Sequence, residues 1–193
     1  IKRYVRGGKK NVLILVPKDK LAKDWILAAK DLDVNVTQLI DTNDKGAGVV
    51  VTTYANFYQN DTLATREWDL IVADESQYLM KNAAGTVTEN LNAFRAATKH
   101  PKGVYQRTIM LNRDLHEEME AIRKQIKKLQ KTSRVLGQSA SDREAMRQAN
   151  FALDALGIKW RAAHDEVEAD VAASQGAGRT RAVFLSATPF AYD

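Results

Sequence analysis

Residues 68–79 read WDLIVADESQYL, a short apolar run that ends on two adjacent carboxylates. Leu70 to Ala73 form the apolar run, and Asp74 and Glu75 follow it directly. A continuous apolar run of this length, bounded by polar residues, is typical of a strand buried on both faces. In open α/β sheets, ligands bind at the carboxyl ends of such strands. The stretch therefore predicts a buried strand with a site at its carboxyl end.

Other apolar runs predict further strands of the same sheet. These runs are NVLILV at residues 11–16, GVVVTT at 48–53 and AVFL at 182–185. Val34 to Leu39 is rich in β-branched residues and predicts a shorter strand. The helices expected between the strands span residues 20–30, 56–64 and 83–98. Strands that alternate with helices indicate an α/β fold with a mostly parallel sheet flanked by helices.

The region 107–172 differs, because it contains no strand-like run. Its first half has apolar residues every three or four positions, at Leu111, Leu115, Met119, Ile122, Ile126 and Leu129. A turn-like stretch follows at 137–141. The next amphipathic segment has apolar residues at Met146, Ala149, Leu153 and Leu156. This pattern predicts a helical hairpin. We therefore expect an α/β domain from residues 1–100 and 179–193, with a helical insertion from residues 101–178.

The chain is mildly basic, with 29 Lys and Arg, 24 Asp and Glu, and a formal charge of +5. Such a balance permits a nucleic-acid partner without requiring one. The first helix of the expected hairpin carries six basic residues: Arg123, Lys124, Lys127, Lys128, Lys131 and Arg134. No acidic residue occurs between Ala121 and Ser141. This segment is either a solvated helix face or a contact for nucleic acid, and both interpretations remain open.

Cysteine is absent from the chain, which excludes disulfides and thiolate metal sites. His100, His116 and His164 show no metal-ligand spacing, so we expect them to be ordinary surface or helix residues. No apolar run approaches the length that spans a bilayer, and no signal peptide opens the chain. We therefore expect a cytoplasmic protein.

The pair Asp74-Glu75 has a known chemical use at the end of a rigid strand. The first carboxylate can hold Mg²⁺, directly or through water, and the second can orient or deprotonate a water that attacks a γ-phosphate. Adjacent acids also occur in solvated turns and near helix N-termini. A pair of carboxylates can, in addition, hold the metal ion of a nuclease. The neighbouring motifs are needed to choose among these roles.

Four segments resemble, in order, the motifs of superfamily 2 helicases and translocases. VLILVPKDKLAKDW at 12–25 resembles motif Ia, VVVTTY at 49–54 motif Ib, IVADESQ at 71–77 motif II, and FLSATP at 184–189 motif III. The resemblance covers most of the chain outside the helical insertion. The resemblance implies the first RecA-like motor domain of a nucleic-acid-dependent ATPase. Such a protein uses ATP and Mg²⁺ to move on DNA or to unwind it.

The resemblance implies roles for the residues at the strand ends. Asp74 would hold the Mg²⁺ that accompanies ATP, and Glu75 would be the catalytic base. Gln77 would contact motif III or the region of the γ-phosphate. Ser186 and Thr188 would couple the state of the nucleotide to the grip on nucleic acid.

A second set of residues would contact the nucleic acid. Pro17, Lys18, Thr52 and Thr53 would lie along its backbone, which suits a motor that moves regardless of sequence. The hairpin adds four basic candidates: Lys124, Lys127, Lys128 and Lys131. By analogy with the family, DNA is expected rather than RNA. A second RecA-like domain of the same polypeptide would be a further partner, and the hairpin is also a candidate surface for a protein partner.

The sequence departs from the family pattern in two ways. No GxxxxGK[ST] motif occurs, and Gly7-Gly8-Lys9-Lys10 lacks its spacing and its Ser or Thr. Asp74 and Ser186 are 112 residues apart, where the family needs far fewer. We therefore expect a fragment that does not hydrolyse ATP alone. Family topology would place a missing strand beside the motif III strand, which would leave a sheet edge exposed.

The stretch SATPFAYD at 186–193 supports a narrower resemblance. It is similar to large phage- and plasmid-borne proteins that join a helicase region to an adenine methyltransferase, related to strawberry-notch-type helicases. Two alternative functions remain open. One is a catalytically inactive RecA-like module that recruits DNA or a protein through the hairpin. The other is a metal-dependent nuclease that uses Asp74 and Glu75 and cleaves without ATP.

Overall fold

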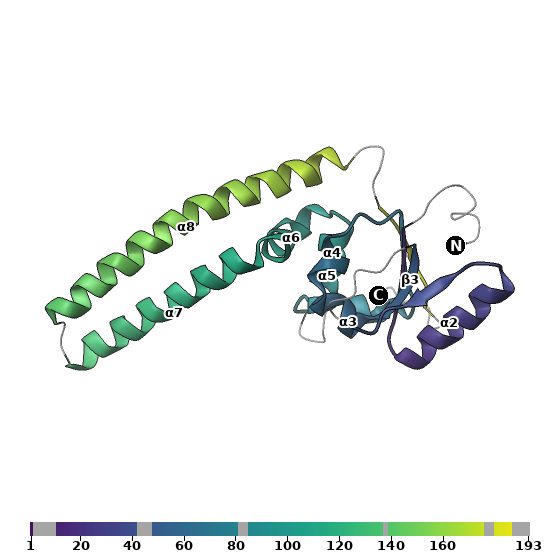
Figure 1. The fold of residues 1–193 in the computed structure, drawn as a ribbon, viewed down its shortest axis with the longest axis horizontal. Helices are drawn as coiled ribbons and strands as arrows, with labels where there is room; N and C mark the ends of the chain where they lie inside the picture. The colour runs from purple at the N-terminus through teal and green to yellow at the C-terminus, as the bar shows by residue number, and fades with distance from the viewer. Residues whose placement is uncertain (2–10, 42–47, 81–84, 137–138, 176–179, 187–193) are drawn as a thin grey trace.

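The computed structural model describes residues 1, 11–41, 48–80, 85–136, 139–175 and 180–186. The sequence Gly7 to Lys10 lies outside the described residues, and so do residues 187–193, which include Thr188 and most of the stretch SATPFAYD. Figure 1 shows a sheet with flanking helices and a long helical hairpin that projects from it. None of the described helices has both the length and the apolar character that crossing a membrane requires.

A five-stranded sheet forms the centre of the first part. Its strands are β1 (Val12–Val16), β2 (Val36–Gln38), β3 (Val49–Thr53), β4 (Leu70–Ala73) and β5 (Arg181–Phe184). The spatial order is β2-β3-β1-β4-β5, and every neighbouring pair is parallel. This arrangement confirms the predicted α/β fold with a parallel sheet. It also places the carboxyl ends of all five strands along one edge.

Helices cover both faces of the sheet. They are α2 (Asp19–Asp31), α3 (Tyr54–Gln59), α4 (Asp61–Thr65) and α5 (Glu89–Ala97), and the 3-10 turn η1 (Ser76–Leu79) follows β4. The single helix expected at 56–64 is in fact two short helices. Asn60 ends α3, and its side chain accepts a hydrogen bond from the backbone of Leu63 to cap α4. Thr88 caps α5 in the same way, so the helix expected at 83–98 starts later, at Glu89.

The core lies on both sides of β1, the central strand, whose five residues are all buried. Side chains alternate between the two faces along a strand. Leu13 packs with Phe57 of α3 in the cluster that α3, α4 and α5 cover. Ile14 packs with Ala22 in the cluster under α2. Burial on both faces explains why the strand is a continuous apolar run in the sequence.

The hairpin consists of two long antiparallel helices that lie between β4 and β5 in the chain. They are α7 (Arg113–Leu136) and α8 (Ala140–Ala173), and they follow η2 (Pro101–Gly103) and α6 (Val104–Leu111). The two helices lie side by side, away from the sheet (Figure 1). Ser139 and Asp142 form a capping box that begins α8. The apolar periodicity of the sequence therefore marks a helix pair, as expected.

A cluster of charges joins the base of the hairpin to the α/β part. The Nζ of Lys99 lies 2.7 Å from a carboxylate oxygen of Glu67 and 2.9 Å from one of Asp170. The buried guanidinium of Arg107 donates to the carbonyl of Ala96 at 3.0 Å and lies 3.4 Å from Glu67. Because Asp170 belongs to α8 and Glu67 precedes β4, these contacts fix the hairpin to the sheet.

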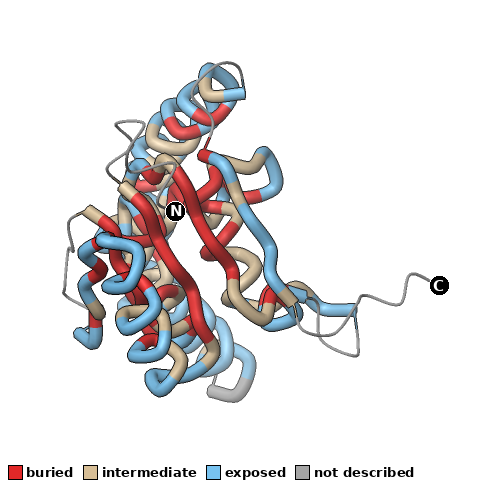
Figure 2. The backbone as a smooth tube through the Cα atoms, turned by 90° about the vertical axis from the view of Figure 1, so that its right-hand side faces the viewer, coloured by how far each residue is buried: buried red, intermediate tan, exposed pale blue. Residues whose placement is uncertain are grey.

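The edge strand β5 is far more exposed than the other strands. Val183 and Phe184 are 43% and 54% exposed, whereas every residue of β1 is buried. In Figure 2 the strand that leads toward the C-terminus is coloured as exposed, beside buried strands. The reason is topological, since β5 pairs only with β4 among the described residues. The apolar run at 182–185 thus overlaps strand β5, which forms one edge of the sheet among the residues that the structure describes.

Candidate functional site

Polar residues gather at the edge of the sheet where the parallel strands end. In the register of the sheet, Val16 of β1 lies beside Thr53 of β3, and Ala73 of β4 lies beside Phe184 of β5. Asp74 comes directly after β4, so it lies at the same edge as the ends of β1, β3 and β5. This edge is where open α/β sheets bind their ligands.

Three hydrogen bonds, two at its carboxylate and one at its backbone N–H, orient Asp74. Its backbone N–H donates to the carbonyl of Leu15 in β1 at 2.9 Å. Its Oδ2 accepts a bond from the indole Nε1 of Trp25 in α2 at 2.9 Å, and its Oδ1 accepts one from the backbone of Glu75 at 3.0 Å. Each carboxylate oxygen has a second lone pair. The carboxylate is therefore oriented by the protein and can still accept hydrogen bonds from a hydrated cation.

Glu75 adopts a left-handed backbone conformation, with φ 49° and ψ 56°. A residue other than glycine rarely takes this conformation, and its strain is held by the structure around it. The conformation turns the chain sharply from β4 into η1. The Oε2 of Glu75 accepts a hydrogen bond from the side-chain amide of Gln77 at 2.8 Å. The turn thus places a carboxylate and an amide together at the strand end.

Gln77 also connects this turn to the end of β5. The Oγ of Ser186 donates to the Oε1 of Gln77 at 3.3 Å, although the two residues are 109 positions apart. Next to this bond, the backbone N–H of Ser76 donates to the carbonyl of Leu185 at 2.8 Å. The structure therefore brings together Glu75, Gln77 and Ser186 in one hydrogen-bonded chain.

Tyr54 stabilises the same turn through a hydrogen bond and a ring contact. Its hydroxyl donates to the backbone carbonyl of Asp74 at 2.8 Å, and its ring stacks on that of Tyr78 with centroids 5.7 Å apart. Burial is the main cause that raises the pKa of the Tyr54 hydroxyl, and the negative charges of Asp74 and Glu75 raise it further. The hydroxyl therefore stays protonated and remains a hydrogen-bond donor well above neutral pH.

The two threonines at the end of β3 have different environments. Thr52 is 1% exposed, and its hydroxyl donates to the carbonyl of Leu39 at 2.9 Å. The side-chain amide of Asn56 donates to the same hydroxyl at 2.7 Å. Thr53 is only half-buried and caps α3. The side chain of Thr52 is therefore directed into the domain, and only Thr53 reaches the edge where a ligand would lie.

The other residues expected to contact nucleic acid divide into two groups. Pro17 and Lys18 follow β1, and Lys18 is exposed at the start of α2, on the same edge as Asp74. The second group lies on α7, and all of its members are exposed: Lys124, Lys127, Lys128 and Lys131. Because α7 leads away from the sheet (Figure 1), the structure does not bring this group to Asp74.

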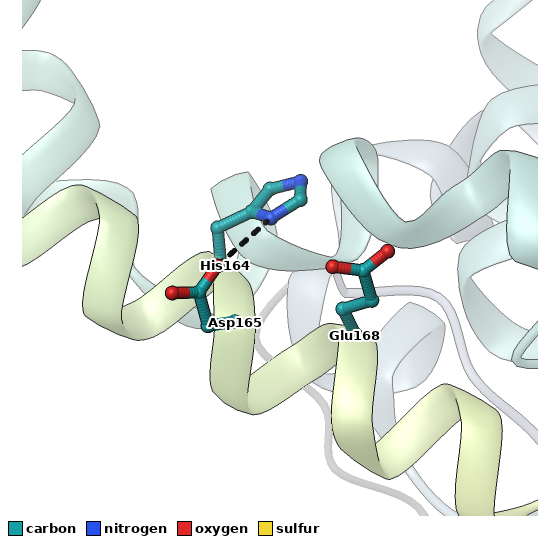
Figure 3. A group of neighbouring side chains, drawn as sticks. All are labelled: His164, Asp165 and Glu168. Carbon is teal, nitrogen blue, oxygen red and sulfur yellow. Dashed lines mark ion pairs between the residues drawn. The ribbon is translucent and has the colours of Figure 1, made fainter.

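A separate group of possible metal ligands lies on α8 (Figure 3). His164, Asp165 and Glu168 each offer one ligand atom, and these atoms lie within 4.8 Å of one another. The prediction that the histidines are not metal ligands rested on their spacing from one another and did not count the acidic residues next to His164. The signal in the sequence is a histidine with acids one and four positions later, because residues four apart share a helix face. Asp165 and Glu168 are exposed, and such surface groups are common without an ion.

Trp25 and Tyr54 both hold the Asp74 turn, although neither was among the site residues predicted from the sequence. Trp25 lies in the segment that resembles motif Ia, and Tyr54 ends the segment that resembles motif Ib. The signal that could have identified them is an aromatic residue with a polar atom near a strand end. No protein-family model matches the chain, and no curated protein matches it either, so the residues and their geometry carry the proposal of function.

Proposed function

We propose that the chain is the first motor domain of a superfamily 2 nucleic-acid-dependent ATPase, a helicase or DNA translocase. In this proposal, hydrolysis of Mg²⁺-bound ATP drives movement on DNA. The observation that carries it is the hydrogen-bonded chain Glu75–Gln77–Ser186 at the carboxyl edge of a parallel sheet. It links a candidate catalytic base to the serine of the segment that resembles motif III.

Asp74 suits the role of a Mg²⁺ ligand, directly or through water. Mg²⁺ prefers carboxylate and water oxygens and keeps several of its waters in proteins. Trp25 and the backbone of Glu75 hold the Asp74 carboxylate in one orientation, and its remaining lone pairs can bind such waters. When bound, Mg²⁺ would neutralise charge that develops on the phosphates.

Glu75 suits the role of general base. A base must lie within hydrogen-bond distance of the water that it activates, and its orientation must be fixed. The left-handed backbone of Glu75 projects its side chain at the strand end, and the amide of Gln77 holds one oxygen. In the proposed reaction, Glu75 positions a water for attack on the γ-phosphate and accepts its proton.

Gln77 would transmit a change at the nucleotide to β5. Its side chain donates to Glu75 and accepts from Ser186, so any movement of the Glu75 carboxylate alters the bond to the end of β5. The nucleic acid would contact Pro17, Lys18 and Thr53 along the same edge. The basic face of α7 would be a second contact, through its four exposed lysines.

The test is DNA-stimulated ATP hydrolysis by the longest reading frame that contains these residues, beside its Glu75→Gln variant. Loss of a general base typically lowers the rate by about 10²–10⁴-fold, and we expect a loss of this size in the variant. The matched control is Glu118→Gln, because Glu118 is an exposed glutamate on α7, outside the hydrogen-bonded group of Asp74, Glu75, Gln77 and Ser186.

The remaining outcomes favour one of the alternatives. DNA binding without hydrolysis in either protein would favour the inactive binding module. Cleavage of DNA that needs Mg²⁺ but not ATP, and that is lost in Glu75→Gln, would favour the nuclease. Equal hydrolysis by the Glu75→Gln and Glu118→Gln variants would remove Glu75 from the mechanism.

A further inference from the structure

The long helix α8 carries an apolar stripe on the side that faces away from α7. We name the stripe by its four residues: Phe151, Ala155, Ile158 and Ala162. Phe151 is 78% exposed and Ile158 is 63% exposed, and the two lie seven residues apart on one face of α8. The opposite side of α8 is buried, at Ala149 and Leu156 among other positions. Helix α8 therefore has a buried face, packed against α6 and α7, and a separate exposed apolar stripe.

The spacing of the stripe is that of a coiled-coil seam. Its residues are separated by four, three and four positions, and large and small side chains each recur after seven residues. Apolar residues with this alternating spacing face a partner helix. Polar residues one step further along the seam, Gln148 and Asp165, mark its two ends. The stripe thus has a defined length, which a short partner segment of equal length would cover.

We propose that the stripe pairs with the same stripe of a second copy of the chain, with the two α8 helices antiparallel about a two-fold axis. In such a symmetric interface, each contact occurs twice, because the two-fold axis exchanges the two copies. With the axis midway along the stripe, Phe151 meets Ala162 of the partner subunit, and Ile158 meets Ala155 of the partner subunit. Every large side chain then faces a small one, which allows close packing.

The charged residues beside the stripe agree with this pairing. Four exposed residues follow one flank at intervals of seven: Arg147, Asp154, Arg161 and Glu168. In an antiparallel pair, residues of this flank face the same flank of the partner helix. Asp154 would face Arg161 of the partner subunit, and Arg147 would face Glu168 of the partner subunit. Opposite charges therefore meet at four positions across the two-fold axis.

The alternative parallel pairing fits the molecule less well. It would stack Phe151 on Phe151 of the partner subunit and leave the alanines opposite one another. It would also place the two α/β parts at the same end of the helix pair, where Figure 1 shows them to be much wider than the hairpin. The antiparallel pairing places them at opposite ends. The shape of the chain therefore favours the antiparallel arrangement.

The test is sedimentation equilibrium of the chain over a range of concentrations. Because the stripe holds only two large side chains per copy, the interface is smaller than the ~1,200 Å² of a standard stable complex. We expect a dimer that forms at several hundred micromolar and dissociates at about 1 µM. The double variant Phe151→Glu/Ile158→Glu should remain monomeric with unchanged helical circular dichroism, because both side chains are exposed. A wild-type chain that is monomeric throughout would overturn the proposal.

Charge reversal tests the register and the direction of the helices. Asp154→Arg alone should weaken the dimer, because it places two arginines together, and Arg161→Asp alone should weaken it by placing two aspartates together. The double reversal should restore it. In a parallel pair, Asp154 would face Lys159 and Arg161 would face Glu166, so the double reversal would weaken the dimer further. Failure of the double variant to recover would refute the antiparallel pairing.

A control addresses a second exposed apolar surface, on β5. Val183 on the open edge of β5 is also exposed, and an edge strand can drive association of its own. Val183→Lys should leave the dimer unchanged. If that variant is monomeric while Phe151→Glu/Ile158→Glu still forms a dimer, the interface belongs to β5 and the proposal is wrong. None of these measurements depends on ATP or DNA, so they test the dimer independently of the proposed function.

Discussion

Trp25 and Asp74 are 49 positions apart in the chain, and a hydrogen bond of 2.9 Å joins the indole Nε1 of the first to Oδ2 of the second. The bond connects α2 with the turn after β4. An indole N–H is a donor only, and a carboxylate is an acceptor only, so the bond has one possible direction. It explains how a side chain at the end of a strand keeps one orientation although it is only half-buried.

Loss of this bond should destabilise the chain measurably. Trp25→Phe removes the donor and some packing, and a hydrogen bond to a charged group contributes about 1.5–3 kcal/mol. We expect a decrease of this order in the free energy of unfolding, measured by urea denaturation. In a double-mutant cycle with Asp74→Ala, a coupling energy of about 0.5–3 kcal/mol is expected. Strictly additive effects of the two substitutions would show that the bond contributes nothing to stability.

Tyr54→Phe should reduce the sensitivity of the fold to alkaline pH. The ordinary pKa of tyrosine is 10.0, and burial, followed by the charges of Asp74 and Glu75, raises that of Tyr54 in the folded chain. Between the unfolded and folded pKa values, the folded chain binds more protons, so stability falls as pH rises above about 10. Below that pH the variant should lose only about 0.5–1.5 kcal/mol from the missing bond to Asp74.

The measurement compares urea denaturation of wild type and Tyr54→Phe between pH 8 and pH 11. The wild type should lose stability more steeply than the variant in the upper part of this range. Tyr105→Phe is the control, because Tyr105 is exposed on α6. Parallel pH profiles for wild type and Tyr54→Phe would show that folding does not raise the pKa of Tyr54.

Two glycine-to-alanine substitutions should change the stability of the folded chain in opposite directions. A Cβ on Gly103 would lie 2.5 Å from the backbone carbon of Arg95 and 2.6 Å from its oxygen, so the backbone must move. Gly103→Ala should cost about 1–3 kcal/mol, as overpacking does. A Cβ on Gly157 meets nothing within 4 Å in the middle of α8, so Gly157→Ala should stabilise the helix by about 0.5–1 kcal/mol. Thermal denaturation of both variants checks the pair.

In the longest reading frame that contains these residues, Gln77→Ala should reduce the stimulation of ATP hydrolysis by DNA more than it reduces the basal rate of hydrolysis. It removes the link from Glu75 to Ser186 but leaves both of those side chains in place. Under the proposed function, we expect stimulation by DNA to fall by more than the basal rate falls. Gln106→Ala is the matched control, since it removes an amide on α6 that takes no part in the bonds between Glu75, Gln77 and Ser186. An equal fall in basal and stimulated rates would limit Gln77 to orienting Glu75.

The parallel sheet could be predicted from the sequence because burial on both faces leaves a continuous apolar run, as in Val12 to Val16. The hairpin could be predicted because its apolar residues keep the helical period over many turns. The break at Asn60 was missed, because the cap depends on a side-chain bond to Leu63 that no periodicity reveals. The exposure of Val183 depends on strand order and not on local composition, so only the topology implied by the family resemblance predicted an exposed edge beside this strand.

The candidate site could be predicted only in part. Asp74 and Glu75 are visible because they directly follow an apolar run. The bonds from Trp25 and Tyr54 to Asp74 join residues that are far apart in the chain, so spacing cannot reveal them. The same holds for the burial of Thr52, because Leu39 and Asn56 determine which way its hydroxyl points. Sequence reasoning therefore found the acids and missed the side chains that orient them.

The hairpin has a mechanical consequence that follows from its length. Helix α8 has 34 residues, which corresponds to a lever arm of about 50 Å at 1.5 Å per residue. The arm is fixed near one end, where Lys99 and Arg107 meet Asp170. A tilt of about 10° at this pivot would carry the far tip through about 9 Å, close to the length of two to three stacked bases at 3.4 Å each. A small tilt at the base of the hairpin would thus move its tip by the length of two to three nucleotides.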